Sequence, residues 1–410
     1  MSLQIRQRNC PICDAHSKEV ITKVDFELFK GHPMNGGYDV VQCTTCGFIY
    51  ANTPVTQNEL DRYYTDLSKY EDKTIGTGGG YTQNDKDRLV VTANFLNKHI
   101  INKNARVLDL GCANGGLLRE LKGHGFTNLV GIDPSLECVN ITKEEVGCEC
   151  YQYSLFDIPE SAGKFDVITL THVLEHVLNV QQTINILDKL LAPSGVIYIE
   201  CPNATYYKEV IHAPYQEFNA EHINHFTEVS FENLMGNFQY KKILTADKIF
   251  KIASDQDYHA VYGLFKKDST YQHPLQFDNA IRSCIDEYIE QSEKIFSEIR
   301  KSIATLPKDR PAALFGVGQF AFKLLKTDIF NSSNDFKLFD NNRMNVGKEI
   351  KGVKIAHGSE LINEYKIAPF SIIISSLIHE APIRKNIEEL FEKNNLKPPV
   401  IVGFSRFLPS

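Results

Sequence analysis

The spacing of apolar and polar positions changes along the chain, and from residue 105 onward two patterns alternate. Short apolar runs are typical of buried strands, and four of them read "ARVLDLG", "NLVGIDPS", "FDVITLTHV" and "VIYIECPN". The segments between these runs, "GLLRELKGHG", "LECVNITKEEVG" and "VQQTINILDKLLAPSG", carry apolar residues at helical spacing. This alternation predicts a parallel α/β sheet in the middle of the chain.

Helical and mixed patterns flank this central region. Residues 55–100 are predicted to be mostly helical, with Thr56 as an N-cap and Glu59 three residues later in a capping-box pattern. Residues 277–306 have the pattern of one long amphipathic helix. After "PKDRP", the segments "AALFGVG", "DFKLFDNN" and "FSIIISS" resemble strands separated by helices. We therefore predict a second, smaller doubly wound α/β unit at the carboxyl-terminal end.

Two C-x-x-C pairs stand near the beginning of the chain, each at the end of an extended stretch. They are Cys10 with Cys13 and Cys43 with Cys46, and Gly47 follows the second pair. Four thiolates at this spacing can close a tetrahedral shell around zinc. A complete shell leaves no open position for water, so we expect a structural site. Iron in the same cage is the alternative.

Composition narrows the class of protein. The chain has 410 residues and a formal net charge of −7, which argues against a surface for nucleic acid or anionic membranes. No apolar run approaches the ~20 residues of a membrane span, so we expect a cytoplasmic protein. The six remaining cysteines are scattered, and in a reducing compartment they are expected to be small buried apolar residues.

The first central strand runs into "VLDLGCANGG", a turn in which backbone N–H groups can approach a ligand closely. Asp109 precedes Gly111 by two positions, Ala113 stands where a middle glycine is common, and Gly115 ends the pattern. A nicotinamide-binding turn would normally open with G-x-G and no such acid.

Two more acids follow the next strands. Asp133 stands 22 residues after Gly111, where a carboxylate can accept from both hydroxyls of a ribose. Asp157 can accept from the amine of an adenine ring that has Phe156 beside it. Taken singly, each acid could also be an exposed strand end or a helix cap.

Together these motifs resemble those of class I S-adenosylmethionine-dependent methyltransferases over roughly residues 80–230. The resemblance implies a set of cofactor-binding residues and, in "THVLEHVLNV", an acid–histidine pair near the methyl donor. That pair is Glu175 with His176, for which either a catalytic or an architectural role is open. The implied cofactor contacts are Asp109, Gly111, Ala113, Gly115, Asp133, Phe156, Asp157 and His172.

The whole chain resembles three-domain C-methyltransferases of nucleotide-linked deoxysugars, through "CPIC…CTTC", "DLGCANG", "EHINHF" and "FGVGQF…LFDNN". This implies a zinc-binding module at 1–68, a Rossmann-like methyltransferase core at 69–275, and a linker helix with a smaller Rossmann-like domain at 276–410. The implied function is C-methylation of a nucleotide-linked keto sugar, in surface-polysaccharide or natural-product biosynthesis.

In the same family an E-H pair after the fifth strand supplies the base, and here it falls on Glu221 and His222. Asn219 occupies the position of a tyrosine that is frequent in the family. His225 and Asn224 are candidates for holding a substrate oxygen. A metal site that combines the two histidines with Glu221, or two ordinary loop histidines, are the alternatives.

The turn "FGVGQF" carries Gly316 and Gly318 after a strand, and Asp340 ends the next strand 24 residues after Gly316. With Ser375, these residues predict a pocket for the nucleotide carrier of the substrate. A packing domain without a ligand is the alternative.

Other reactions stay open at this stage. Oxygen or nitrogen methylation needs only one base or a desolvated amine. A non-catalytic, zinc-stabilised binding protein and a nicotinamide oxidoreductase would each share parts of the pattern. Binding of S-adenosylmethionine or of NAD(P)H distinguishes them.

Overall fold

A computed structural model describes residues 8–67, 78–253, 256–327, 330 and 336–409. The chain divides into two compact units. The first comprises Met1–Thr22, Asp39–Tyr206 and Glu221–Arg282, and the second comprises Lys23–Tyr38, Tyr207–Ala220 and Ser283–Ser410. The domain boundary expected between residues 68 and 69 lies outside the described residues.

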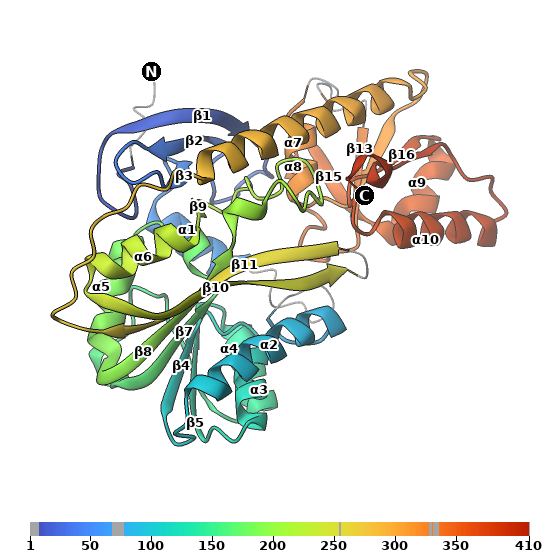
Figure 1. Cartoon of the computed structure of the whole chain (residues 1–410). Helices are drawn as coiled ribbons and strands as arrows, with labels where there is room; N and C mark the ends of the chain where they lie inside the picture. The colour runs from blue at the N-terminus through green and yellow to red at the C-terminus, as the bar shows by residue number, and fades with distance from the viewer. Residues whose placement is uncertain (1–7, 68–77, 254–255, 328–329, 331–335, 410) are drawn as a thin grey trace. The chain divides into compact units, whose positions relative to one another are not determined.

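The first unit is built on a seven-stranded sheet with the order β10-β11-β8-β7-β4-β5-β6 (Figure 1). Strands β6, β5, β4, β7 and β8 run parallel, as the alternating pattern predicts, whereas β11 is antiparallel to β8 and to β10. The strands are β4 (Arg106–Leu110), β5 (Asn128–Asp133), β6 (Glu149–Gln152), β7 (Phe165–Thr171), β8 (Leu191–Pro202), β10 (Tyr240–Ala253) and β11 (Gln256–Lys267).

Helices cover both faces of this sheet (Figure 1). Successive residues of a strand point to opposite faces, so each strand packs against helices on both sides. Val107 and Val167 pack with α2, α3 and α4, whereas Leu108, Ile168 and Leu170 pack with α5 and α6. The helices of this unit are α1 (Gln57–Asp66), α2 (Gln83–His99), α3 (Gly116–Gly123), α4 (Leu136–Val146), α5 (Val180–Leu190) and α6 (Glu228–Asn237). The strands are therefore buried on both sides, which explains their nearly continuous apolar runs.

A four-stranded sheet with the order β1-β2-β3-β9 carries the cysteine pairs. Its strands are β1 (Lys18–Asp25), β2 (Gly37–Cys43), β3 (Ile49–Asn52) and β9 (Asn224–His225). Strand β9 belongs to the "NAEHINHFT" segment and pairs antiparallel with β3, with Ile49 opposite His225.

The second unit has a six-stranded sheet with the order β14-β15-β13-β12-β16-β17, parallel except for β14. Its strands are β12 (Ala312–Phe315), β13 (Phe336–Asp340), β14 (Glu349–Ile350), β15 (Val353–His357), β16 (Ser371–Ile374) and β17 (Ile401–Val402). Its helices are α7 (Ile281–Ala304), α8 (Gln319–Leu325), α9 (Leu361–Ile367) and α10 (Glu380–Lys393). The long amphipathic helix and the second doubly wound sheet expected from the sequence are confirmed.

Local details agree with the pattern except in two places. The capping box of α1 is formed as predicted, with Glu59 N–H donating to Thr56 Oγ1 and Thr56 N–H to the Glu59 carboxylate. The helix expected to continue through "LLAPSG" ends at Leu190 instead, since Pro193 cannot continue a helix. The long hairpin of β10 and β11 was not predicted, because its lysine-rich strands lack a clear apolar alternation. Among the described helices, none combines the length and the apolar character that crossing a membrane requires.

Candidate active site

A pocket of about 370 Å³ opens at the carboxyl ends of β4, β5 and β7 in the first unit. Its volume falls in the ~300–1,000 Å³ range of small-molecule sites, and this edge of a parallel sheet is where α/β proteins bind ligands. The lining includes Tyr64, Asp85, Arg88, Asp109, Gly111, Ala113, Asp133, Phe156, His172, Glu175, His176, His222, Phe250 and Tyr258.

Glycines with positive φ shape the turn between β4 and α3. Gly111 has φ +71° and Gly115, the N-cap of α3, has φ +72°. A Cβ at position 111 would lie 2.7 Å from Val173 Cγ2, and one at position 115 would lie 2.9 Å from Thr142 Oγ1 on α4. Both positions therefore require glycine. Ala113 between them also has a positive φ, 45°, and lines the pocket.

Two buried carboxylates end the first two strands. Asp109 accepts a hydrogen bond from Thr169 Oγ1 at 2.6 Å, and burial raises the pKa of Asp109 to about 7. Asp133 accepts from the N–H groups of Ala113 and Ser135, each at 2.9 Å. Both carboxylates line the pocket, so they can also accept from hydroxyl or amino groups of a ligand.

The remaining predicted cofactor contacts lie on the loop after β6 and on the end of β7. Phe156 lines the pocket, whereas Asp157 is exposed and follows the lining segment by one residue. His172 lines the pocket with a positive φ of 55°. Such a backbone is uncommon for a residue with a side chain, so the surrounding contacts must hold it.

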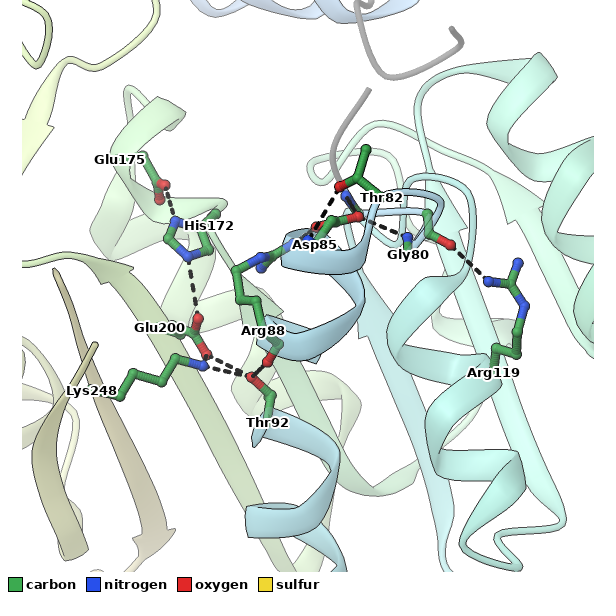
Figure 2. A network of polar contacts seen from close by, with 12 residues as sticks. Gly80, Thr82, Asp85, Arg88, Thr92, Arg119, His172, Glu175, Glu200 and Lys248 are labelled. Atoms are coloured by element: carbon green, nitrogen blue, oxygen red, sulfur yellow. Dashed lines mark hydrogen bonds and ion pairs between the residues drawn. The ribbon is translucent and has the colours of Figure 1, made fainter. Parts of the chain in front are cut away.

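A buried network of charged side chains holds His172, as Figure 2 shows. Its Nδ1 lies 3.2 Å from Glu175 Oε1, and its Nε2 lies 3.2 Å from Glu200 Oε1. Glu200 also accepts from Lys248 Nζ at 2.5 Å and from Thr92 Oγ1 at 3.2 Å. One imidazole therefore lies between two carboxylates, at the end of the strand that borders the pocket.

This network shifts the pKa values of its members. Burial acts to lower the pKa of His172, but the hydrogen bonds to Glu175 and Glu200 outweigh it, and the pKa is raised. Burial acts to raise the pKa of Glu175, but His172 and then His176 outweigh it and lower this pKa to about 2. Burial likewise opposes ionisation of Glu200, whose pKa Lys248 and His172 hold well below its usual range. Each charge in this network therefore favours the ionised form of its partners.

Helix α2 contributes a second polar group to the same pocket (Figure 2). Asp85 Oδ2 accepts from the N–H groups of Gly78 and Gly80 at 2.9 and 2.7 Å, and Arg88 donates to Asp85 Oδ1 at 2.8 Å. Asp85 thus fixes both the glycine-rich approach to α2 and the guanidinium of Arg88. Arg88 offers the pocket a cation for an anionic group of a ligand.

Three side chains with acid–base chemistry meet at one corner of the pocket. One ligand-type atom from each of Glu175, His176 and His222 lies within 4.8 Å of the other two. His176 Nδ1 lies 3.0 Å from the carbonyl oxygen of Glu221, which can only accept, so Nδ1 carries the proton and Nε2 is the basic nitrogen. The rings of His176 and His222 lie 4.9 Å apart, and Tyr64 lies edge-on to His176 at 5.6 Å. We refer to Glu175, His176 and His222 as the histidine corner.

The other residues of "NAEHINHFT" surround this corner rather than line it. Glu221 is buried, and its Oε1 accepts from Tyr63 Oη at 2.8 Å. Asn224 and His225 form β9 and are buried, and the pocket lining, as far as the chain is described, includes neither of them. Asn219 belongs to the second unit, where its carbonyl accepts from Tyr38 Oη at 2.9 Å. The structure therefore brings only His222 of this segment to the pocket.

The two C-x-x-C pairs come together as predicted from their spacing. All four Sγ atoms lie within 4.8 Å of one another, with Cys10 and Cys46 3.6 Å apart and Cys13 and Cys43 3.5 Å apart. Ligands ~2.3 Å from a tetrahedral zinc lie about 3.8 Å from one another, so this cage fits the ion.

The predicted carrier site lies at the carboxyl edge of the sheet in the second unit. Gly316 has φ +94°, and the Asp340 carboxylate accepts from the N–H groups of Val317 and Asn342 at 2.9 and 2.8 Å. Ser375 Oγ donates to Phe315 O at 3.1 Å. Gly318 is the N-cap of α8. A cavity of about 220 Å³ lies beside these positions, lined by Phe315, Asn341, Gly358, Ser359, Leu361, Ile383, Asn386, Ile387 and Leu390.

Several residues in or beside the pocket were not identified from the sequence, although Arg88 in the lining and Glu200 beside it left a signal. Arg88 stands on an otherwise buried face of α2 with Asp85 and Thr92, a polar stripe at helical spacing. Glu200 interrupts the apolar run "VIYIECP", where an acid is costly unless it has a partner. Phe250 and Tyr258 come from the unpredicted hairpin, and nothing in their spacing connects them with the pocket.

Comparison with known sequences relates this pocket to a family. A family model described as a methyltransferase domain matches residues 84–245. The ubiquinone biosynthesis O-methyltransferase of Actinobacillus pleuropneumoniae serotype 7 (strain AP76) is 34% identical over 164 residues, which cover 36% of this chain and 68% of that protein. The mitochondrial enzyme of the same name from Rattus norvegicus is 31% identical over 121 residues, 27% of this chain and 35% of the rat protein. For the mitochondrial relatives, the match thus spans only about a third of their length.

Solved structures resemble the chain more distantly. The plantazolicin methyltransferase BpumL in complex with SAH has a TM-score of 0.39 and 17% identity, over 51% of this chain and 94% of that one. The magnesium protoporphyrin IX methyltransferase ChlM from Synechocystis PCC 6803 with bound SAH has a TM-score of 0.38 and 16% identity, over 45% and 84%. Likeness at this level carries no argument about ligands or chemistry, and the sequence matches decide the family.

Proposed function

Because this chain belongs to the class I S-adenosylmethionine-dependent methyltransferases, we propose that it methylates a small molecule with S-adenosylmethionine as the donor. The observation that carries this proposal is the pocket itself, with Asp109 and Asp133 at the strand ends and His222 at its histidine corner. A mostly apolar cavity of this size, with a few charged and polar groups, fits a small acceptor together with the donor.

The lining residues fit the parts of the cofactor. Asp133 offers carboxylate oxygens for ribose hydroxyls, and Phe156 offers an apolar face for the adenine ring. Arg88 offers a guanidinium for the carboxylate of the amino-acid part. Gly111 and Ala113 let the backbone approach the ligand closely. Asp157, one residue beyond the lining, stays a proposed contact of the adenine amine.

When bound, S-adenosylmethionine supplies a methyl group that is already activated on a sulfonium. The protein must therefore orient the acceptor and remove a proton from it. We propose that a ring nitrogen of His222 takes this proton. His176 lies beside it with its Nδ1 proton held by the Glu221 carbonyl, so its Nε2 can share the proton or contact the acceptor. Glu175 keeps a negative charge at this corner, because its pKa is lowered to about 2.

For the acceptor we propose a nucleotide-linked keto sugar that is methylated at carbon, in surface-polysaccharide or natural-product biosynthesis. The support is the resemblance of the four-cysteine module, the core and the tail to that family, together with a histidine at the pocket. A carbon acid next to a ketone needs a base, and an imidazole has a suitable pKa for it. The second unit would bind the nucleotide carrier at Gly316, Gly318, Asp340 and Ser375.

Oxygen methylation is the competing reaction. The curated relatives in the comparison are O-methyltransferases by name. A phenol or sugar hydroxyl also loses its proton to one base, so the same His222 would serve. The position of the methyl group in the product distinguishes the two reactions.

For the four cysteines we propose a structural zinc ion. Their sulfur separations of 3.5 and 3.6 Å suit a tetrahedral thiolate shell. Metal analysis of the purified protein should find one zinc per chain, and iron instead of zinc would overturn this part of the proposal.

The decisive experiment measures binding and turnover together. Isothermal titration with S-adenosylmethionine should show binding, and labelled donor with a panel of nucleotide-linked keto and hydroxy sugars should yield a methylated product whose position NMR locates. His222→Ala should abolish turnover while cofactor affinity stays within about twofold, because this side chain acts on the acceptor. His124→Ala, at the C-cap of α3, is the matched control.

Each alternative has its own signature in that experiment. Neither heat nor a thermal shift with the donor would indicate a non-catalytic scaffold, and a shift with NAD(P)H would indicate an oxidoreductase. The donor set of the histidine corner would also suit a divalent cation. Suppose that chelation stops turnover, that Mg²⁺ or Zn²⁺ restores it, and that His222→Ala removes this response to the metal. His222 would then be a metal ligand and not the base.

A further inference from the structure

Arg8 makes an unusual set of contacts for a residue two positions before a cysteine knuckle. Its guanidinium is half-buried and donates to carbonyl and amide oxygens on three separate segments of the first unit. Nη2 donates to Leu178 O at 2.6 Å, to Asn224 Oδ1 at 2.8 Å and to Val177 O at 3.3 Å, and Nη1 donates to Ile223 O at 3.2 Å and to Ala51 O at 3.4 Å.

These segments flank the histidine corner on both sides. Val177 directly follows the short 3₁₀ helix Leu174–His176, which carries two members of the corner. Ile223 directly follows His222, the third member. Ala51 lies on β3 of the sheet that carries the cysteine pairs. One guanidinium therefore connects both halves of the corner to that sheet.

Backbone and amide hydrogen bonds also connect the 3₁₀ helix, residues 223–224 and β3, and we refer to this contact region as the joint. Ile223 N–H donates to Glu175 O at 2.8 Å, and Ala51 N–H donates to Ile223 O at 2.9 Å. The side-chain amide of Asn224 donates to Leu174 O and to Val177 O, each at 2.7 Å. The amide of Asn224 thus bridges the 3₁₀ helix and Arg8 at once.

The backbone of Arg8 is itself fixed by the cysteine-bearing sheet. Arg8 N–H donates to Asn52 Oδ1 at 3.1 Å, and Arg8 O accepts from Lys18 Nζ at 2.6 Å. Its guanidinium also lies 5.6 Å from the ring centroid of Tyr50 on β3. The backbone of Arg8 is therefore anchored in the cysteine-bearing sheet, whereas its guanidinium reaches the segments that flank the histidine corner.

The chemistry of this contact favours a role in geometry. The five acceptors are carbonyl and amide oxygens, and no carboxylate is among them, so neutral hydrogen-bond acceptors hold the charge. A planar guanidinium presents five N–H donors in a rigid fork, which a lysine cannot reproduce. A half-buried guanidinium that bonds backbone carbonyls of three segments is consistent with a residue that specifies one arrangement of the backbone.

We propose that Arg8 is a positioning residue that sets the separation of His222 from Glu175 and His176, and that the four-cysteine module acts on catalysis through it. This inference rests on the proposed role of His222 as the base. Arg8 is absent from the lining of the pocket, as far as the chain is described, so its effect on the reaction is indirect.

The test uses Arg8→Lys in the full-length protein. A displaced base loses about 10–100-fold in kcat, whereas the affinity for S-adenosylmethionine should stay within about twofold, since the strand-end carboxylates are untouched. Hydrogen exchange at the Ile223 amide should become faster, because lysine cannot reproduce the guanidinium's hydrogen bonds to Ile223 O and Asn224 Oδ1. Arg106→Lys is the matched control. Arg106 also donates to backbone carbonyls, Ala162 O at 3.0 Å and Lys164 O at 3.4 Å, but it starts β4 at the opposite end of the sheet.

Two outcomes would overturn the proposal. One is kcat within twofold of wild type with unchanged exchange at Ile223. The other is a loss of kcat that an equal loss of cofactor affinity accompanies, which would indicate a general disturbance of the core. If Arg8→Lys does not fold, Asn224→Ala acts on the same joint from the other side and should show the same split.

Where both variants fold, a double-mutant cycle adds a further test. Arg8→Lys and Asn224→Ala together should cost less in kcat than the product of the single effects, because the two residues share one joint. Additive effects would contradict the inference. Full turnover of His222→Ala would refute the base and with it the link to catalysis, while the exchange experiment would still decide whether Arg8 holds the segment.

Discussion

The buried ion pair between Lys248 and Glu200 gives the sharpest prediction about stability. Lys248 Nζ lies 2.5 Å from Glu200 Oε2, with side-chain exposures of 8% and 0%. In Lys248→Met the carboxylate loses its closest cation and keeps Thr92, Tyr198 and His172 as hydrogen-bond partners. Methionine retains the length and apolar stem of lysine, so the change isolates the charge.

The expected size follows from the burial of both partners. Removal of one partner of a buried pair costs about 3–5 kcal/mol, because the other charge loses its main compensation. On the same strand, Lys251 pairs with Asp257 at 2.6 Å, but these side chains are 49% and 44% exposed. Lys251→Met should therefore cost no more than about 1 kcal/mol. For a folding unit of this size, the larger loss lowers Tm by roughly 10 °C and the smaller by roughly 3 °C.

Urea unfolding followed by circular dichroism, supported by thermal scans, measures both variants under identical conditions. The double variant Glu200→Gln with Lys248→Met should recover part of the loss, since it leaves no uncompensated anion. The reasoning is refuted if Lys248→Met and Lys251→Met differ by less than about 1 kcal/mol in the free energy of unfolding, because burial would then not distinguish the two pairs.

Three further predictions concern pH, the glycine turn and the metal. The pKa of His172 is raised in the folded state, so its charge stabilises the fold below the unfolded pKa of about 6.5, and this contribution is lost as pH rises through the folded pKa. The difference in unfolding free energy between wild type and His172→Gln should thus shrink above pH ~6.5, by about 1.4 kcal/mol for each unit of pKa shift, and a pH-independent difference in urea titrations would contradict it. Gly111→Ala should weaken S-adenosylmethionine binding about 10–100-fold by calorimetry, given the positive φ and the close approach to Val173, whereas Gly123→Ala, with open space around its Cβ, should bind normally. Cys43→Ser should bind less than one equivalent of the proposed zinc and lower Tm, and metal analysis showing a full equivalent in this variant would argue against the four-thiolate shell.

The central part of this fold was accessible from the sequence because its signals are local. Strands buried on both faces require continuous apolar runs, and the positive φ of Gly111 and Gly115 requires glycine. The carboxylates at the strand ends follow from the topology of a parallel sheet, which brings Asp109 and Asp133 to one edge. The clustering of the two cysteine pairs was likewise predicted from their spacing alone.

The candidate site was accessible only in part. His222 was predicted to meet the acceptor and lies at the pocket, whereas Asn224 and His225 from the same segment are buried around β9. Their spacing resembles that of a polar loop, and no local rule indicates that this short stretch pairs with β3. The hairpin residues Phe250 and Tyr258 reached the pocket for the same reason, through a strand pairing that their own pattern did not predict.

By itself, the sequence determined the strands of the parallel sheets, most of the helices, the tight turns and the two cysteine pairs, since each of these signals depends on neighbours a few residues away. Only the tertiary structure decided which charges neutralise one another beside the pocket and what holds the histidine corner. Arg8 and Ile223 are 215 positions apart, and Lys248 and Glu200 are 48 apart. Contacts at such separations depend on how all the layers pack, because a buried charge is tolerated only where the completed fold brings it a partner.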